Sequence, residues 1–487
     1  MTSAPVSPSP TSLSSQSFAS LPLSAAVLDN LRELGYDNMT PIQAESLPAL
    51  LAGRDVIAQA KTGSGKTAAF GISALNNLDP RLFAIQALVL CPTRELADQV
   101  MQELRRLARA LGNIKILSLC GGVSIGPQIG SLEHGAHVVV GTPGRVLKHL
   151  QKETLTLNRV NTFVLDEADR MLDMGFYDSI LAVNEQLPKR RQTLLFSATY
   201  SEEIRGLSGR FQNDPLEVTV ESVHTETQIE QQFFEVADKN RVSAVGNLLR
   251  AFVFNNSTNA SDEKEKQKSE EKSALLFCNT KQRCDEVTQT LRAQGFHVAA
   301  LHGDLEQRDR DQVLAQFSNM SCPLLVATDV AARGLDIKDL TAVINVELAF
   351  DPEVHVHRIG RTGRAGQVGL ALSLCAPAEA HRALAIEEYL KQPMNWQTLP
   401  STKSSSTIPV PAWVTLQISG GRKDKLRPGD ILGALTGEGG IAGTQVGKIA
   451  IADLHAYVAV TRDAASAAIQ RIEKDGIKAK PFKIRRL

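Results

Sequence analysis

The chain has 487 residues, which is more than one hydrophobic core can organise, and a domain size of roughly 150 residues suggests about three domains. Hydrophobic residues make up 43% of the sequence and charged residues 22%, a composition typical of chains that fold in water. The 53 basic and 53 acidic side chains cancel, which excludes a uniformly basic protein and leaves room only for a local basic surface.

No apolar run approaches the roughly 18 residues that span a bilayer, and the N-terminal segment lacks the basic start and apolar core of a secretory leader. The six cysteines occur singly, without the spacing of metal ligands. We therefore expect a cytoplasmic protein without a membrane span, with reduced thiols and no zinc.

Residues 1–17 are dominated by Ser, Pro and Thr, which predicts a disordered tail. In residues 18–220, short apolar runs such as ALVLC, HVVVG and TLLFSAT alternate with helical patterns. This order is typical of buried parallel strands with helical crossovers, so we expect an α/β domain.

Residues 221–395 repeat the same alternation and predict a second α/β domain. A polar, highly charged stretch, 255–273, interrupts it and reads as a disordered insert. Residues 396–411 have the composition of a linker. Residues 412–487 then show the order β-α-β-β-α-β, the ferredoxin-like layout of RNA-recognition motifs.

A glycine-rich turn, AKTGSGKT at residues 60–67, lies between a predicted strand and a predicted helix. Such a turn points its backbone N–H groups at phosphates, with the helix N-terminus adding positive charge. Lys66 would reach the β and γ phosphates and Thr67 would ligate Mg²⁺. Ala60 replaces the usual first glycine. The other residues expected to hold the nucleotide are Thr62, Gly63, Ser64 and Gly65.

About a hundred residues later, the apolar strand TFVLD ends in Asp166-Glu167-Ala168-Asp169. Carboxylates at the carboxyl end of a buried strand lie where α/β folds bind their ligands. Asp166 would hold Mg²⁺, and Glu167 would orient the attacking water. An acidic strand end alone is more often a solvated helix start, but the phosphate loop upstream favours the catalytic interpretation.

With these motifs in this order, residues 18–375 resemble the DEAD-box ATP-dependent RNA helicase family. The resemblance implies two tandem RecA-like parallel-sheet domains. GYDNMTPIQ is similar to the family's Q motif, in which Gln43 would read the adenine edge while Phe18 stacks on the ring. The implied cofactors are ATP and Mg²⁺.

The resemblance also implies contacts to the RNA backbone from both domains. Taken alone, these motifs are more often turns or helix caps. The implied RNA contacts are Pro92, Thr93, Arg94, Gly122, Thr142, Gly144, Arg145, Thr328 and Asp329.

Further motifs imply coupling and nucleotide contacts. Ser197, Thr199 and His357 would couple hydrolysis to unwinding, and Asp336 would contact the ribose of ATP. Arg361 and Arg364, in HRIGRTGR, would stabilise charge on the γ-phosphate during transfer. His355 stands where many members have a tyrosine.

The last domain is locally basic and contains the segments ISGGRKDKLRPGDILGALTGEGGI and GKIAIADLHAYVAV. These segments resemble the RNA-binding domain of the DbpA subgroup, which implies binding of 23S ribosomal RNA in pre-50S particles. Its predicted strands offer one aromatic side chain, Tyr457, so base stacking on the sheet is doubtful. Whether the sheet or the basic loop carries specificity stays open. The loop residues are Arg422, Lys423, Lys425 and Arg427.

Together these features predict a monomeric helicase that locally unwinds RNA. An ATP-gated RNA clamp without net unwinding would use the same motifs and stays an alternative. The intact Glu167, Ser197 and Arg361 favour turnover. A DNA helicase is a weaker alternative, because the family's grip depends on ribose 2′-hydroxyls.

Overall fold

The computed structural model describes seven stretches of the chain: residues 16–60, 64–220, 229–254, 272–332, 340–363, 368–400 and 408–487. Most of the expected tail 1–17 and insert 255–273 therefore lies outside the described residues. So do four predicted site residues, Thr62, Gly63, Asp336 and Arg364. The chain divides into two compact units, Met1–Thr225 and Glu226–Leu487.

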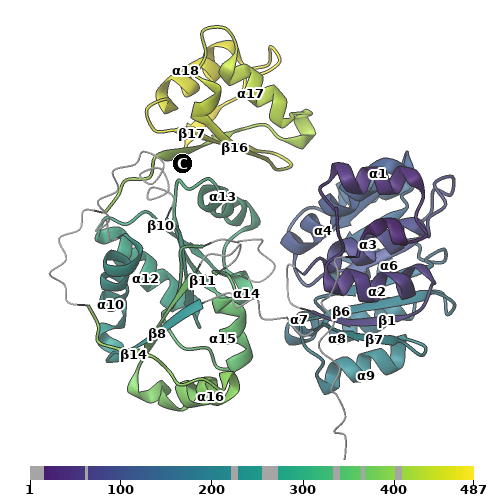
Figure 1. Ribbon diagram of the computed structural model, residues 1–487. Coiled ribbons are helices and arrows are strands. Elements are labelled where there is room, and N and C mark those ends of the chain that lie inside the picture. The colour runs from purple at the N-terminus through teal and green to yellow at the C-terminus, as the bar shows by residue number, and fades with distance from the viewer. Residues whose placement is uncertain are drawn as a thin grey trace, which may run out of the picture. The chain divides into compact units, whose positions relative to one another are not determined.

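The first unit is built on a seven-stranded parallel sheet with the order β3-β4-β2-β5-β6-β1-β7. Figure 1 labels β6, β1 and β7 of this sheet. Two of its strands, β3 and β7, are partly exposed and lack a strong apolar run, which explains why the sequence pattern did not reveal them. The strands are β1 (Val56–Gln59), β2 (Ala87–Leu90), β3 (Ile116–Leu119), β4 (Val138–Gly141), β5 (Thr162–Asp166), β6 (Gln192–Ser197) and β7 (Leu216–Thr219).

Helices cover both faces of this sheet, and each face has its own hydrophobic cluster. Successive residues of β1 alternate between them: Val56 and Ala58 join one cluster, and Ile57 joins the other. Burial on both faces explains the continuous apolar strands. The helices are α1 (Ala25–Glu33), α2 (Pro41–Leu51), α3 (Lys66–Asn76), α4 (Arg94–Leu107), α5 (Gly126–Glu133), α6 (Pro143–Gln151), α7 (Ala168–Asp173), α8 (Tyr177–Asn184) and α9 (Glu202–Phe211).

The second unit contains another seven-stranded parallel sheet, with the order β10-β11-β9-β12-β13-β8-β14. Its last strand, β14, is the two-residue segment Trp396–Gln397, so the sheet extends past residue 395 into the range expected as a linker. The others are β8 (Ile229–Glu235), β9 (Ala274–Cys278), β10 (Val298–Leu301), β11 (Leu324–Thr328), β12 (Ala342–Asn345) and β13 (Gly369–Cys375).

The helices of this second sheet again lie on both faces, over separate hydrophobic clusters. They are α10 (Arg241–Leu248), α12 (Lys281–Ala293), α13 (Gln307–Ser318), α14 (Asp329–Ala332), α15 (Pro352–Ile359) and α16 (Ala380–Leu390). The two tandem parallel sheets confirm the predicted RecA-like architecture.

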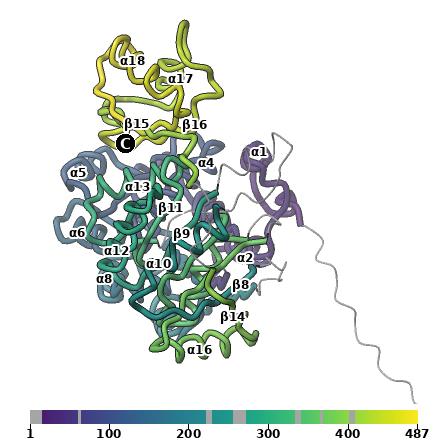
Figure 2. Tube along the Cα trace, turned by 90° about the vertical axis from the view of Figure 1, so that its left-hand side faces the viewer, coloured from purple at the N-terminus to yellow at the C-terminus, as the bar shows by residue number. Residues whose placement is uncertain are grey.

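A small antiparallel sheet, β16-β17-β15-β18, completes the second unit and confirms the β-α-β-β-α-β order. Its helices lie on one side of the sheet (Figure 2) and pack on alternate residues of β15: Val414, Leu416 and Ile418. The elements are β15 (Trp413–Ile418), α17 (Pro428–Thr436), β16 (Val446–Ile451), β17 (Ala456–Thr461), α18 (Ala465–Asp475) and β18 (Ile484–Arg486).

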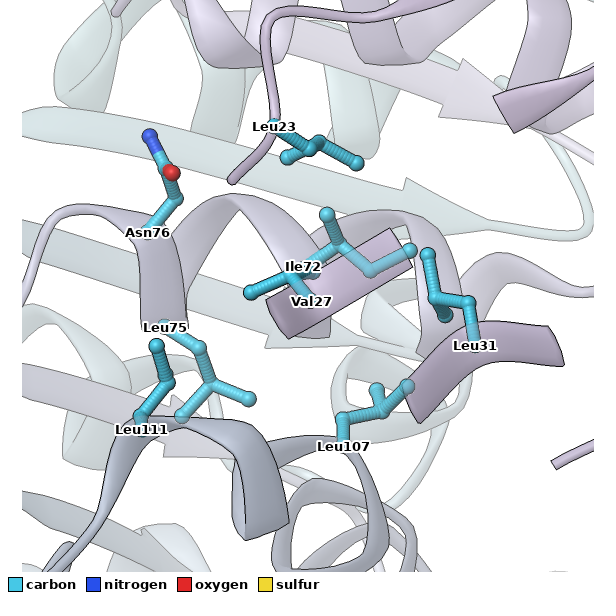
Figure 3. Close-up of a pocket in the computed structure, with 8 residues that line it drawn as sticks. All are labelled: Leu23, Val27, Leu31, Ile72, Leu75, Asn76, Leu107 and Leu111. Carbon is cyan, nitrogen blue, oxygen red and sulfur yellow. The ribbon is translucent and has the colours of Figure 1, made fainter. Parts of the chain in front are cut away.

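Within the described stretches, no helix is long and apolar enough to cross a membrane. A small pocket lies in the first unit, and Figure 3 shows its largely aliphatic lining. None of the predicted site residues lines it. The lining residues are Leu23, Val27, Leu31, Ile72, Leu75, Asn76, Leu107 and Leu111.

Candidate nucleotide and RNA sites

The phosphate loop joins β1 to α3, and its backbone is left-handed at Gly65, with φ +95°. A Cβ at this position would lie 2.5 Å from Nε2 of Gln43. That amide donates to the carbonyl oxygen of Gly65 at 3.0 Å, while its Oε1 accepts the backbone N–H of Thr40 at 2.9 Å. Gln43 therefore ties the Q motif to the phosphate loop, and the close approach requires glycine.

Lys66 begins α3 and is buried, with its ammonium Nζ donating to the carbonyl oxygen of Ala60 at 2.7 Å. The charge therefore lies at Ala60, the first residue of the AKTGSGKT turn. Thr67 follows in the first turn of the same helix. The hydroxyl of Ser64 is buried and has no hydrogen-bond partner among the described residues, so a ligand oxygen could satisfy it.

Phe18, expected to stack on adenine, lies in the 3-10 helix Phe18–Ser20 and is only 3% exposed. Its ring packs edge-on against Tyr36, with 6.1 Å between ring centroids. The ring therefore offers little free surface to a base in this conformation.

The acidic motif lies at the carboxyl end of β5. Burial raises the pKa of Asp166 to about 7; nearby Lys66 lowers it, and neighbouring Glu167 raises it. Glu167 is also buried, and its Oε2 accepts a hydrogen bond from Nη1 of Arg170 at 2.6 Å. Sequence reasoning missed Arg170, although the i,i+3 spacing from Glu167 was a readable signal.

The last carboxylate of this motif, Asp169, holds the loop after β6. Its Oδ2 accepts the backbone N–H groups of Ala198 at 2.9 Å and Thr199 at 3.1 Å. The hydroxyl of Ser197 is buried without a partner among the described residues. The predicted coupling loop is therefore bonded directly to the acidic motif.

The donors near the phosphate loop suit Mg²⁺. The carboxylate of Asp166 and the hydroxyl of Thr67 are hard oxygen ligands, and the charge of Lys66 acts on Asp166. No group of three His, Cys, Asp or Glu side chains in the described stretches could form a protein-only metal site. A magnesium ion held by one or two protein ligands together with nucleotide phosphates fits this set.

The predicted RNA motifs of the first unit lie at helix starts that follow strands. Thr93 caps α4 by accepting the N–H of Leu96, and Thr142 precedes α6. Arg145 donates to Gln128 Oε1 and to the carbonyl oxygen of Val123, both at 2.7 Å.

Arg145 therefore holds the loop after β3, in which Gly122 has a φ of +77°. The remaining predicted contacts are spread over the same motifs: Pro92 and Arg94 at the start of α4, and Gly144 in the first turn of α6.

In the second unit, a buried arginine joins three segments of the chain. Arg358 on α15 donates to both oxygens of Asp329, at 2.6 and 2.7 Å, and to Oδ1 of Asn279 at 2.7 Å. Asn279 donates in turn to the carbonyl oxygen of Leu348. Asp329 directly follows Thr328, and both are expected RNA contacts. The helix α15, which carries Arg358, therefore holds this part of the predicted RNA site in place. Sequence reasoning assigned no role of its own to Asn279.

Arg361 lies just beyond α15 and is 8% exposed, and His357 lies on the helix itself. His355 is fully buried, with Nε2 3.1 Å from Gln231 Oε1 and its ring stacked on Phe233. Burial and nearby Arg358 lower the pKa of His355 to about 4. This residue is therefore a neutral core histidine.

In the small antiparallel domain, the basic loop is exposed and the sheet is covered. All four basic side chains predicted in this loop, at positions 422, 423, 425 and 427, are exposed, while Leu426 between them anchors in the core. On the sheet face away from the helices, Thr415, Gln417 and Tyr457 are at most 3% exposed.

Contacts within the second unit explain this burial. The hydroxyl of Thr415 bonds to Asn319 at 3.1 Å and to Ser321 at 2.6 Å, and Arg485 reaches Gln312 on α13. In this arrangement the sheet face is not open for base stacking.

Comparisons with known proteins identify the family of this chain. Three family models match: DEAD/DEAH box helicase over residues 40–207, helicase conserved C-terminal domain over 250–366, and DbpA RNA binding domain over 415–486. The ATP-dependent RNA helicase DbpA of Escherichia coli (strain K12) is 54% identical over 96% of this chain and 98% of that protein. CshA of Geobacillus kaustophilus, a DEAD-box ATP-dependent RNA helicase, is 42% identical over 79% of each chain.

Among solved structures, Saccharomyces cerevisiae Dbp5 bound to RNA and ADP BeF3 matches with a TM-score of 0.69 and 30% identity, covering 79% of this chain and 96% of that one. Mss116p bound to single-stranded RNA and AMP-PNP gives the same TM-score at 25% identity, covering 80% of this chain and 81% of that one.

The chain therefore belongs to the DEAD-box helicase family and is an RNA-stimulated ATPase and ATP-dependent RNA helicase. Its similarity over nearly the whole chain, together with the matched C-terminal domain, places it in the DbpA subgroup.

Proposed function

We propose that this helicase acts on 23S ribosomal RNA in pre-50S particles, where its C-terminal domain binds the target and the two RecA-like domains locally unwind nearby RNA. The exposed basic loop of the DbpA-type domain carries this proposal. Because the sheet face is covered and the loop is exposed, we favour the loop, and not the sheet, as the element that binds RNA phosphates. A ribosomal RNA substrate implies a cytoplasmic protein, and we expect it to act as a monomer.

For hydrolysis, we assign the roles by chemistry. Lys66 would bind the β and γ phosphates, since its ammonium lies at Ala60, where the phosphate loop begins. Thr67 and Asp166 would hold Mg²⁺, which neutralises phosphate charge when bound. Glu167 would orient the attacking water. Gln43, already bonded to the loop at Gly65, would read the adenine edge.

The remaining nucleotide contacts are proposed from the motifs alone: Thr62, Gly63 and Ser64 at the phosphates, Phe18 at the base and Asp336 at the ribose. Arg361 and Arg364 would stabilise charge on the γ-phosphate. Since these arginines and Glu167 belong to different RecA-like domains, hydrolysis would require the two domains to close together on ATP and RNA.

RNA binding by the core would be sequence-independent. The groups assigned to it are hydroxyls, arginines, glycines and backbone N–H groups, which suit sugars and phosphates and carry no base readout. Target choice would therefore rest on the C-terminal domain, while Ser197, Thr199 and His357 would couple hydrolysis to strand separation.

The test compares ATP hydrolysis stimulated by 23S ribosomal RNA, poly-A RNA and DNA. In the full chain, the four loop residues are changed to glutamine: R422Q/K423Q/K425Q/R427Q. We expect selective stimulation by 23S ribosomal RNA, lost in this variant, with the salt dependence of RNA binding reduced by about one unit for each phosphate contact removed.

A variant with the same change in charge at exposed positions of the first RecA-like domain serves as control: K152Q/R159Q/K189Q/R190Q. Equal stimulation by every RNA would reject the 23S target while leaving the helicase activity in place. Displacement of a labelled RNA duplex, measured in the same reactions, tests the alternative: RNA-dependent hydrolysis without strand displacement would favour the ATP-gated clamp.

A further inference from the structure

Glu167 occupies an unusual backbone position. It stands between β5 and α7 with φ 53° and ψ 53°, a left-handed conformation that non-glycine residues rarely adopt. Such conformations persist where the surroundings hold them, and they concentrate at functional sites. The side chain that this backbone presents is buried and must be fixed by its neighbours.

Arg170 is the cation that meets this side chain. Its Nη1 donates to Oε2 of Glu167 at 2.6 Å, and the two side chains are only 9% and 6% exposed. A short hydrogen bond between buried ionised groups restricts the rotation of the carboxylate much more than a contact in water would. Both residues lie within one helical turn, so the pair is formed locally.

The charge of Arg170 also offsets the repulsion between two neighbouring carboxylates. Asp166 and Glu167 are adjacent buried carboxylates that repel each other. Lys66 acts on Asp166, and Arg170 bonds to Glu167, so each carboxylate has its own cation. Without Arg170, Glu167 would remain buried beside a like charge, and a change of its side-chain conformation would relieve the repulsion.

Arg170 is also connected to the coupling loop through its backbone. Its N–H donates to Oδ1 of Asp169 at 2.9 Å, and the other oxygen of that carboxylate accepts the N–H groups of Ala198 and Thr199. A displacement of this loop would therefore act on the Arg170–Glu167 pair through the carboxylate of Asp169.

We propose that Arg170 is a positioning residue, which fixes the carboxylate of Glu167 in the orientation needed to direct the attacking water at the γ-phosphate. The inference rests on the proposed role of Glu167 and adds a residue that acts through that carboxylate. It acts on the hydrolysis step alone, since it holds a group used only there.

The test uses R170Q and R170K in the full chain, with steady-state hydrolysis measured at saturating RNA. We expect R170Q to lower kcat about tenfold, as for other changes in groups that orient a reacting residue. KM for ATP and the affinity for RNA should stay within twofold. R170K, which keeps the charge without the planar fork, should lie between R170Q and the wild type.

A double-mutant cycle separates positioning from structure. If Arg170 acts through Glu167, R170Q should change the single-turnover rate of E167Q less than twofold. R106Q is the matched control, because it removes another i,i+3 Arg–Glu pair, Arg106–Glu103 at 2.8 Å on α4, and should leave kcat unchanged. Thermal unfolding of every variant reports on folding; if R170Q does not fold, R170K decides by the same criteria.

A wild-type kcat in R170Q, an equal loss in the E167Q background, or a parallel rise in KM for ATP would overturn the inference. An inactive wild type would instead reject the proposed roles in hydrolysis, so the two failures are distinguishable.

Discussion

The guanidinium of Arg358 holds the carboxylate of Asp329 through two hydrogen bonds, Nε–Oδ1 at 2.6 Å and Nη2–Oδ2 at 2.7 Å. The arginine side chain is 1% exposed, and it also donates to the carbonyl oxygen of Glu347 and to Asn279. Only the planar guanidinium of an arginine can donate hydrogen bonds to all these acceptors together. The pair fixes the helix that leads to Arg361 against the strand end proposed to bind RNA.

Replacing this arginine should therefore damage both stability and activity. We expect R358K to lower the free energy of unfolding of the second unit by about 3 kcal/mol, because it leaves buried acceptors unsatisfied. RNA-stimulated hydrolysis should fall with it. Calorimetric unfolding measures the first effect; R54K, at an exposed guanidinium, is the control and should stay within about 0.5 kcal/mol. A wild-type unfolding profile for R358K would contradict the argument.

A second prediction concerns Asp169, whose carboxylate accepts two backbone N–H groups from the loop proposed to couple hydrolysis to unwinding. In the wild type, Oδ1 accepts the N–H of Arg170 and Oδ2 accepts the two loop N–H groups. D169N replaces one of these oxygens with an NH2 group, which accepts no hydrogen bond. We expect the number of duplexes separated per ATP hydrolysed to fall about tenfold, because hydrogen bonds to a charged group that stabilise the loop are lost. KM for ATP should change less than twofold.

Strand displacement of a labelled RNA duplex, measured beside ATP hydrolysis, checks this expectation. D178N, at an exposed aspartate on α8, is the control. Equal losses of hydrolysis and unwinding would mean that Asp169 supports the active site as a whole and not the coupling.

The parts of the site that sequence could predict are those in which function follows from neighbours along the chain. The phosphate loop lies between a strand and a helix, and Asp166 ends a strand, so local patterns were sufficient to locate both. The partners of Arg358 were not predictable in this way, since Asn279 and Asp329 meet it only through the fold of the second sheet.

The same limit applies to packing. The two-residue strand β14 has no periodicity to read, and its existence depends on the edge of β8. Thr415 and Gln417 look like surface residues of a two-sided strand, but contacts with the turn after α13 bury them. The burial of polar strand positions depends on which surface packs against them. That surface cannot be identified from the pattern of a single sequence.

A third prediction follows from His355. Its pKa is lowered to about 4 by burial and by Arg358, below the unfolded value of 6.5. The folded protein therefore favours the neutral form of His355. The contribution of this preference to the free energy of unfolding is fully present above pH 6.5 and is lost as the pH falls toward 4. The loss should reach about 3 kcal/mol across that window.

We expect H355F to reduce the fall in unfolding temperature of the second unit between pH 7 and pH 4.5. The loss of the hydrogen bond to Gln231 lowers stability at every pH, so the slope and not the absolute value is the measurement. H381F, at an exposed histidine on α16, should keep the wild-type slope. An unchanged slope in H355F would assign the acid sensitivity to other groups.

The last prediction tests the contact between the Q motif and the phosphate loop. G65A would place a methyl group 2.5 Å from the amide of Gln43, at a backbone φ of +95° that alanine adopts only with strain. The amide must then leave the loop, so the group proposed to read adenine and the loop proposed to bind phosphate are disturbed together. We expect at least a tenfold loss of ATP affinity, roughly the effect of 1 to 2 kcal/mol of backbone strain.

Binding of a fluorescent ATP analogue measures this loss directly, without dependence on RNA. G209A is the matched control, because Gly209 lies within α9 with no atom within 4 Å of the added methyl, and alanine there should stabilise the helix by about 0.5 to 1 kcal/mol. If G65A binds the analogue as tightly as the wild type, the loop adapts to the methyl group. The hydrogen bond from Gln43 would then be a feature of the nucleotide-free protein with no part in binding ATP.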